Sequence, residues 1–300
     1  CSQGFVDVAS MLQASGANVT LPDFQGCTPL ITSVINGHLD MVKWLVDNTP
    51  CDVNTTDNMG STALYRACEN NRAQIVDYLI SIGADVTICN HDHASPLGIT
   101  CFSGSMEGLK ILLKHKEKVF LDNTKEVYAS LSEAIRGNKM KIFKFLLQHK
   151  FDTNIVNKNG NIQLHVACDL NRFDFIDLLL GRVTNINCKN RRGETPLFLL
   201  ITAFAAQKSQ LYFTDLEHTV DKFLKAGADI NAADCRGFTA LFYACQHAAV
   251  SICELLVSRG ARADSRDILG QSILHAVVTR PGLPPSHDIL DWILDHGVPV

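Results

Sequence analysis

Glycine residues recur along this chain at intervals of about 33 residues, and this period constrains the fold more than any other feature. Six glycines mark it, with successive gaps of 34, 100, 33, 44 and 33 residues: Gly26, Gly60, Gly160, Gly193, Gly237 and Gly270. The gap of 100 residues is three periods long, and weaker copies of the pattern lie at His93 and Glu126. A period of this length is typical of a stack of small repeated units, each packed against its neighbours.

A hydroxyl side chain stands two residues after the period position in six copies. These residues are Thr28, Thr62, Ser95, Thr195, Thr239 and Ser272. Such a hydroxyl accepts a hydrogen bond from a free backbone N–H in the first turn of a helix. Pro29, Pro96 and Pro196 follow directly, at the first helical position, where a missing N–H costs nothing. The period therefore predicts where helices begin.

A second helix is predicted in each unit from apolar residues at positions i, i+1, i+4 and i+5, as in Ile75-Val76 and Leu79-Ile80. A glycine that can take the left-handed conformation often ends it, as at Gly16, Gly83, Gly227, Gly260 and Gly297. Each unit is thus expected to run helix, turn, helix, hairpin.

These residues resemble ankyrin repeats. The resemblance rests on the period, on Thr-Pro-Leu at 28–30 and 195–197, on Gly-His-Leu-Asp at 37–40 and on Gly-Ala-Asp at 83–85 and 227–229. TPR and HEAT arrays have longer periods and lack the Thr-Pro start and the hairpin glycine. The resemblance implies an all-α ankyrin-repeat solenoid in one array over residues 1–300. The expected parts are a partial unit at 1–22 and units starting near 23, 57, 90, 123, 157, 190, 234 and 267. Because the array opens and stops within the pattern, we expect a piece of a longer protein.

Two insertions depart from the period. The sixth unit carries eleven extra residues within 203–218, since its gap is 44 rather than 33 residues, and these must loop out or lengthen the two helices. The eighth unit has about four extra residues in 280–286, where three prolines exclude a regular helix.

The fourth unit is degenerate and basic. Residues 108–150 carry ten Lys or Arg against four Asp or Glu, whereas the whole chain has a net charge of −4. One hypothesis is a patch for an acidic partner or a phosphorylated ligand. The alternative is that the lysines only keep the outer helix faces in solvent.

The overall charge gives no reason to expect binding to nucleic acid or to an anionic membrane. The most apolar stretch, 196–206, is about half of the ~20 residues that a helix needs to cross a bilayer. Eleven cysteines, an odd number without a C-x-x-C pair, favour a reduced cytoplasmic or nuclear protein.

No nucleotide-binding, hydrolase, protease or kinase motif is present, so we assign no catalysis, cofactor or metal. Cys68, Cys101, Cys168 and Cys245 occupy one repeat position and are predicted to be core residues. Cys27 and Cys235 lie at hairpin positions and are expected to be more exposed.

Histidines at three places in the chain are candidates for a functional or structural role. His91-Asp-His93 lacks a nearby third ligand, so surface exposure is favoured over a metal pair. His165 and His275 stand where ankyrin repeats use histidine for hydrogen bonds between neighbouring hairpins, so the resemblance implies a structural role for both.

The resemblance also implies a concave binding surface for protein partners, built from hairpin tips and inner helices. The predicted partner-binding residues are Phe24, Gln25, Asn58, Met59, His91, Asp92, Arg191, Arg192, Glu194, Arg236, Phe238, Gln246 and His247. The apolar and arginine side chains at the tips have no obvious role in folding, and incidental exposure is the alternative. We therefore expect the double variant Arg192→Ala with Phe238→Ala to bind a partner more weakly while its thermal unfolding stays nearly unchanged.

The predicted function is a protein–protein interaction scaffold or adaptor. Two alternatives stay open for a longer parent protein: a substrate-recognition arm of an enzyme or ubiquitin-ligase receptor, and the cytosolic array of a membrane channel. A smaller hypothesis is that Asp-Val-Asn at 52–54 and Asp-Ile-Asn at 229–231 resemble turns offered to an asparagine hydroxylase.

Overall fold

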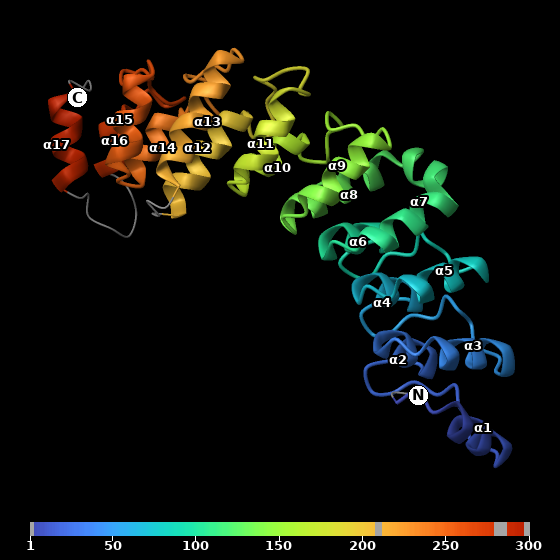
Figure 1. Cartoon of the computed structure of the whole chain (residues 1–300). Helices are drawn as coiled ribbons and strands as arrows, with labels where there is room; N and C mark the ends of the chain where they lie inside the picture. The colour runs from blue at the N-terminus through green and yellow to red at the C-terminus, as the bar shows by residue number, and fades with distance from the viewer. Residues whose placement is uncertain (1–2, 208–211, 279–286, 297–300) are drawn as a thin grey trace. The chain divides into compact units, whose positions relative to one another are not determined.

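The computed structural model describes residues 3–207, 212–278 and 287–296. Within these ranges α-helices are the regular elements, joined by hairpins that contain three isolated β-bridges. The predicted all-α fold is confirmed. The chain forms two compact units, residues 1–152 and 153–300, hereafter unit 1 and unit 2 (Figure 1). The expected single array over 1–300, with its repeat boundaries, stays a prediction.

Unit 1 contains α1 to α9. Their bounds are α1 Val6–Ala14, α2 Pro29–Asn36, α3 Leu39–Asn48, α4 Ala63–Glu69, α5 Ala73–Ser81, α6 Pro96–Ser103, α7 Met106–Leu121, α8 Thr124–Arg136 and α9 Met140–Gln148. Helices α2, α4, α6 and α8 pack in one row, and α1, α3, α5 and α7 pack in a second row beside it (Figure 1).

Unit 2 contains α10 to α17 among its described residues. Their bounds are α10 Gln163–Asp169, α11 Phe173–Leu180, α12 Pro196–Gln207, α13 Phe213–Lys225, α14 Ala240–Gln246, α15 Val250–Ser258, α16 Ile273–Val278 and α17 His287–Asp295. Helices α10, α12, α14 and α16 pack in succession, with α11, α13, α15 and α17 as their partners on the second row. We call the first row of each unit the inner helices and the second row the outer helices.

The predicted helix starts are confirmed at five of the six hydroxyl positions. The side chains of Thr28, Thr62, Ser95, Thr195 and Thr239 each accept a hydrogen bond from the backbone N–H three residues later. At the sixth position, Ser272 Oγ instead lies 2.8 Å from His275 Nδ1. The hydroxyls satisfy N–H groups that the first helical turn leaves free.

Left-handed backbone follows the period as expected. All six period glycines have φ between 75° and 83°, and His93 takes the same conformation at φ 60°, so this weaker copy of the turn is confirmed. Gly16, Gly83, Gly227 and Gly260 are also left-handed after outer helices. Gly297 and the insertion at 280–286 lie outside the described residues.

The weaker copy of the turn expected at Glu126 is wrong. Helix α8 already begins at Thr124, with Asn123 capping it, so Glu126 lies in a helical first turn. The chain has no glycine between 109 and 136 that could adopt a left-handed turn at low cost. Glu126 Oε1 instead accepts hydrogen bonds from Ser95 Oγ at 2.5 Å and Ser130 Oγ at 3.3 Å, and burial raises the pKa of this carboxyl while the two hydroxyls oppose the shift.

The four recurrent cysteines pack in the core, as predicted. Cys68, Cys101, Cys168 and Cys245 are buried on inner helices, and burial raises the thiol pKa of the first three. A neutral thiol behaves here as a small apolar side chain.

The insertion in the sixth unit lengthens both of its helices. Helix α12 has 12 residues and α13 has 13, compared with 7 and 9 in α4 and α5. Phe204 and Phe213, from the two added turns, lie with their ring centroids 6.5 Å apart in an edge-on contact. This contact buries apolar surface that the extra residues bring with them.

Candidate functional site: the hairpin row and the inner helices

Each hairpin is closed by an acidic or amide side chain at its first residue. Asp57 Oδ1 accepts hydrogen bonds from the backbone N–H groups of Met59 and Ser61, both at 2.9 Å. The same pair of bonds recurs at Asp23, Asn157, Asn190, Asp234 and Asp267. These bonds fix the turn, so the two tip residues that follow present their side chains from a rigid backbone.

Neighbouring hairpins of unit 1 are joined by their backbones. The N–H of Asn58 donates to the carbonyl of Gln25 at 3.0 Å, and the N–H of His91 donates to the carbonyl of Met59 at 2.9 Å. Asn58 Nδ2 also donates to the carbonyl of Phe24 at 3.0 Å. The structure therefore brings the predicted tip residues of unit 1, Phe24, Gln25, Asn58, Met59, His91 and Asp92, into one continuous exposed row.

Unit 2 repeats this ladder. The N–H of Arg191 donates to the carbonyl of Asn159 at 2.8 Å, the N–H of Cys235 to that of Arg192 at 2.8 Å, and the N–H of Ile268 to that of Arg236 at 3.0 Å. Arg191, Arg192 and Arg236 are exposed, whereas Glu194 and Phe238 are half-buried. The tips at 191–192 and 236 carry cations, whereas those of unit 1 carry neutral, histidine or acidic side chains.

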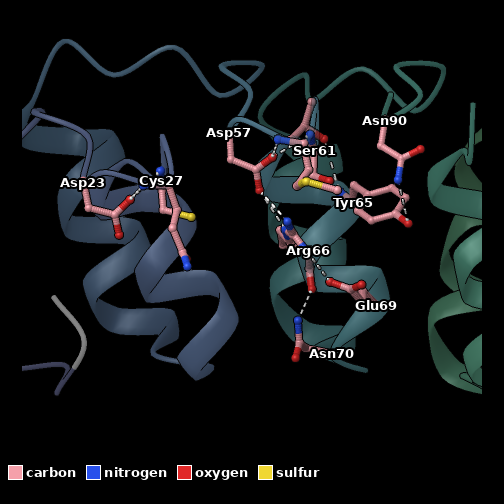
Figure 2. A network of polar contacts seen from close by, with 12 residues as sticks. Asp23, Cys27, Asp57, Ser61, Tyr65, Arg66, Glu69, Asn70 and Asn90 are labelled. Carbon is pink, nitrogen blue, oxygen red and sulfur yellow. Dashed lines mark hydrogen bonds and ion pairs between the residues drawn. The ribbon is translucent and has the colours of Figure 1, made fainter. Parts of the chain in front are cut away.

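An ion-pair network fixes the inner face of α4 (Figure 2). Arg66 Nη2 lies 2.7 Å from Asp57 Oδ2, and Arg66 Nη1 lies 2.8 Å from Glu69 Oε2. Asn90 Nδ2 donates to the hydroxyl of Tyr65 at 3.3 Å, which links the network to the next hairpin. Burial, with a contribution from Glu69, raises the pKa of Tyr65 to about 12. Sequence reasoning missed this network, whose one signal in the sequence is the acidic residue at the hairpin start.

A cavity of about 490 Å³ lies on unit 2, lined by two hairpins and two inner helices. Arg192 and Arg236 come from the hairpins, Phe198 from α12 and Tyr243 from α14. The Phe198 and Tyr243 rings meet edge-on with centroids 5.3 Å apart. We call this the Arg192–Arg236 cavity. The sequence predictions included both arginines but missed the two aromatic residues, whose signal was an aromatic side chain three or four residues after the helix-start threonine.

The expectation that Phe238 has no role in packing is wrong. Its ring stacks on that of Phe242, with centroids 4.5 Å apart, and meets Tyr243 edge-on at 5.7 Å. Phe242 is fully buried, so Phe238 covers the core of unit 2. These ring contacts remove the basis for expecting that the Arg192→Ala with Phe238→Ala variant leaves thermal unfolding nearly unchanged.

Gln246 and His247 lie at the opposite end of α14 from its hairpin. His247 lines a cavity of about 340 Å³ together with Phe204, Phe213 and Ile252, beside the lengthened α12 and α13. Both residues are half-buried. The structure therefore places them apart from the tip residues 236–238 of the same repeat, since α14 is 7 residues long and rises about 1.5 Å per residue.

The expectation that Cys27 is exposed is wrong, whereas Cys235 is exposed as predicted. Cys27 directly precedes the helix-start Thr28, and its N–H and carbonyl both bond to Asp23 across the hairpin. Only 8% of its surface is accessible. Burial, together with the charges of Asp23 and Asp57, raises the pKa of its thiol.

His165 has the structural role that was predicted. Its Nδ1 accepts from the N–H of Ile162 at 3.2 Å, and its Nε2 lies 3.2 Å from the carbonyl of Glu194 on the next hairpin. The ring is buried, and this burial lowers the pKa of His165 to about 4. The neutral ring with its proton on Nε2 fits both contacts.

The basic stretch exposes lysines on the outer helix α7 and on α9, which packs against α8. Lys110 and Lys114 of α7 and Lys141 and Lys144 of α9 are exposed, and Lys110 pairs with Glu107 at 2.7 Å. This distribution fits both hypotheses made from the sequence.

The two asparagines of the modification hypothesis join successive repeats. Asn54 Oδ1 accepts from the N–H of Asp85 at 2.9 Å, and Asn231 Oδ1 accepts from the N–H of Arg262 at 2.8 Å. Their modification stays a prediction.

Neither a metal cluster nor a membrane-spanning helix is found within the described ranges. No group of three or more His, Cys, Asp or Glu side chains there could hold a metal ion. None of the helices between 3 and 296 that the structure describes has both the length and the apolar character needed to cross a membrane.

A family model of ankyrin repeats in three copies matches residues 1–90, 127–209 and 204–300. Three similar proteins align over more than four fifths of the chain. Human transient receptor potential cation channel subfamily A member 1 is 27% identical over 92% of the chain and 25% of its own length. Ankyrin repeat protein L371 of Acanthamoeba polyphaga mimivirus is 26% identical over 88% of the chain and 34% of its own length. Phosphocholine transferase AnkX of Legionella pneumophila is 25% identical over 84% of the chain and 25% of its own length. The chain thus spans about a quarter to a third of these relatives.

Proposed function

Because the chain belongs to the ankyrin repeat family, we propose that it is a protein–protein interaction module, acting as a scaffold or adaptor through its hairpin row and inner helices. The observation that carries this proposal is the backbone ladder between hairpins. It holds exposed side chains such as Phe24 and Arg191 at fixed spacing, while Asp or Asn side chains satisfy the turns beneath them. A rigid row of apolar and arginine side chains is suited to contact a partner with little loss of conformational entropy.

Site-specific photo-crosslinking tests which surface is used. The benzophenone amino acid is placed at Phe24 or Arg191 on the tips, and at exposed Gln74 of α5 or Glu254 of α15 on the outer helices as matched controls. In extract of the native cell, tip positions should crosslink a defined protein and the controls should not. Equal crosslinking from the outer helices would contradict the proposal.

A second surface, the basic stretch at 108–150, is proposed to bind an acidic partner. Exposed Lys141 and Lys144 of α9 support it, because among the described residues neither forms an ion pair and both lie on one helix. Replacing both by Glu should abolish capture of such a partner, whereas Lys225→Glu on α13 should not. If both variants capture it as well as wild type, the lysines serve only to keep the helix surface in solvent.

The free thiols of the ten described cysteines support the cytoplasm, or the nucleus, as its location. We further propose that the chain serves as the recognition array of a larger protein. Its alignment to a cation channel subunit over 92% of the chain favours a cytosolic channel array, and an enzyme or ubiquitin-ligase receptor is the alternative. Sequencing the transcript across both ends decides between them: apolar spans of about 20 residues indicate a channel, and a catalytic or ligase-recruiting domain indicates the alternative.

A further inference from the structure

The Arg236 guanidinium in the Arg192–Arg236 cavity is held in place by neighbouring side chains. The Arg236 guanidinium lies 4.9 Å from the Phe238 ring centroid and 5.7 Å from that of Tyr243, and it donates to the Tyr243 hydroxyl. Its Nε is 3.4 Å from Asp234 Oδ2. Stacking of this kind fixes the planar group, so a ligand that binds it loses little side-chain entropy.

The carboxylates in the cavity wall are already used within the protein. Asp234 Oδ1 accepts from the N–H groups of Arg236 and Phe238, both at 2.9 Å, and only 2% of the side chain is exposed. Glu194 Oε2 accepts from Asn190 Nδ2 at 2.8 Å. Asp234 thus pairs with Arg236 through its other oxygen, Glu194 is bonded to Asn190, and neither carboxylate forms an ion pair with Arg192.

Arg192 supplies a second, uncommitted cation. Its backbone N–H bonds to Asn190 Oδ1, and within the described residues its guanidinium makes no hydrogen bond or ion pair. Arg192 and Arg236 each stand two residues after the first residue of their hairpin, Asn190 and Asp234. At the same position the other hairpins carry Gln25, Met59, Asp92, Asn159 and Leu269, so two neighbouring hairpins with arginine there occur only at this cavity. The cavity therefore combines two guanidinium groups with an aromatic wall.

We propose that this cavity binds an anionic side chain of a partner protein, with its charged group between Arg192 and Arg236 and its stem against Phe198 and Tyr243. The anion is a carboxylate or a phosphoryl group, because the fork of a guanidinium matches both. This inference rests on the proposed function and adds the chemistry of the partner: an acidic or phosphorylated segment lying across the tips of unit 2.

The test uses the whole chain and three fluorescein-labelled peptides of the form Gly-X-Gly-X-Gly-X-Gly, with X as Glu, phosphoserine or Gln. Fluorescence anisotropy gives Kd at low and moderate salt. We expect wild type to bind at least one anionic peptide and to bind the Gln peptide at least tenfold more weakly. The Glu and phosphoserine arms show which anion the cavity selects.

Arg191 provides a matched control, because it is exposed on the same hairpin as Arg192 but does not line the cavity. Arg192→Ala should raise the Kd for the anionic peptide at least tenfold, and Arg191→Ala should raise it less than twofold. Arg236→Lys keeps the charge but not the fork, so it should also weaken binding, and thermal unfolding of each variant confirms that it folds.

Three results would overturn the proposal: no binding of either anionic peptide, equal binding of the Gln peptide, or equal losses from the Arg191 and Arg192 variants, which would indicate diffuse surface charge. None of them bears on whether a protein crosslinks to the hairpin row, so this inference and the proposed function fail separately.

Discussion

Arg66 reaches back nine residues along the chain to Asp57, placing Nη2 2.7 Å and Nε 2.9 Å from the same carboxylate oxygen, Oδ2. The other oxygen of Asp57 closes the hairpin through two backbone N–H groups. The Asp57 side chain is only 1% exposed, so its charge depends on Arg66 and the turn for stabilisation. One residue thus joins the geometry of a hairpin tip to the inner helix beside it.

Removing Arg66 should therefore destabilise unit 1. Because Arg66→Ala leaves a buried carboxylate without its cation, we expect a loss of about 3 kcal/mol in the free energy of unfolding, measured by urea denaturation. Asp57→Asn is the matched comparison, since Asn closes the hairpins at Asn157 and Asn190, and its cost should be smaller. A loss below about 0.5 kcal/mol for Arg66→Ala would mean that water replaces the guanidinium at no cost.

Two phenylalanines at hairpin tips should respond differently to truncation. Phe24 is fully exposed, so Phe24→Ala should change unfolding by less than about 0.5 kcal/mol. Phe238 stacks on buried Phe242, so Phe238→Ala should cost about 1–2 kcal/mol. Chemical denaturation of the two single variants provides the comparison. Equal effects would show that the ring contacts of Phe238 contribute nothing.

His165 should make stability fall as the solution becomes acidic. The pKa of its ring is lowered by burial to about 4, compared with about 6.5 when unfolded, so the unfolded chain takes up the proton first. The stabilisation is complete above pH 6.5 and is lost as pH falls toward 4, and at pH 5 it has dropped by about 2 kcal/mol. Protonation of Nδ1 would also remove the acceptor for Ile162 N–H.

Thermal unfolding from pH 7.5 to pH 4.5 checks this prediction against His165→Gln, which keeps a donor and an acceptor but does not titrate in this range. The melting temperature of wild type should fall more steeply than that of the variant. Parallel curves would show that carboxyl groups alone account for the acid sensitivity.

The thiols of Cys27 and Cys235 should differ in reactivity, although each lies close to a hairpin glycine. Cys27 directly follows Gly26, and Cys235 stands two residues before Gly237. Burial and two nearby carboxylates raise the pKa of Cys27, which lowers its thiolate fraction at pH 8, whereas Cys235 is exposed. Alkylation by iodoacetamide, followed by peptide mass spectrometry, should modify Cys235 at least tenfold faster. Similar rates would mean that the first hairpin opens readily.

The sequence by itself determined the local elements of this protein. Apart from the turn at Glu126 and the helix start at Ser272, the structure confirms the helix starts, the left-handed turns and the core cysteines that the repeat pattern predicts. Each of these features depends on a few adjacent residues and their backbone preferences. The tip row was likewise readable, since it follows from the position of each hairpin in the repeat.

Only the tertiary structure decided which tip residues pack and which stay free. Cys27 is buried, Phe238 covers Phe242, and Arg236 is held over Tyr243 from the neighbouring inner helix. These outcomes depend on contacts with particular side chains of other elements, and the repeat pattern does not specify those contacts. The physical reason is that exposure and charge pairing are set by which side chains meet in three dimensions, within a repeat and between repeats, whereas the period specifies only the backbone that carries them.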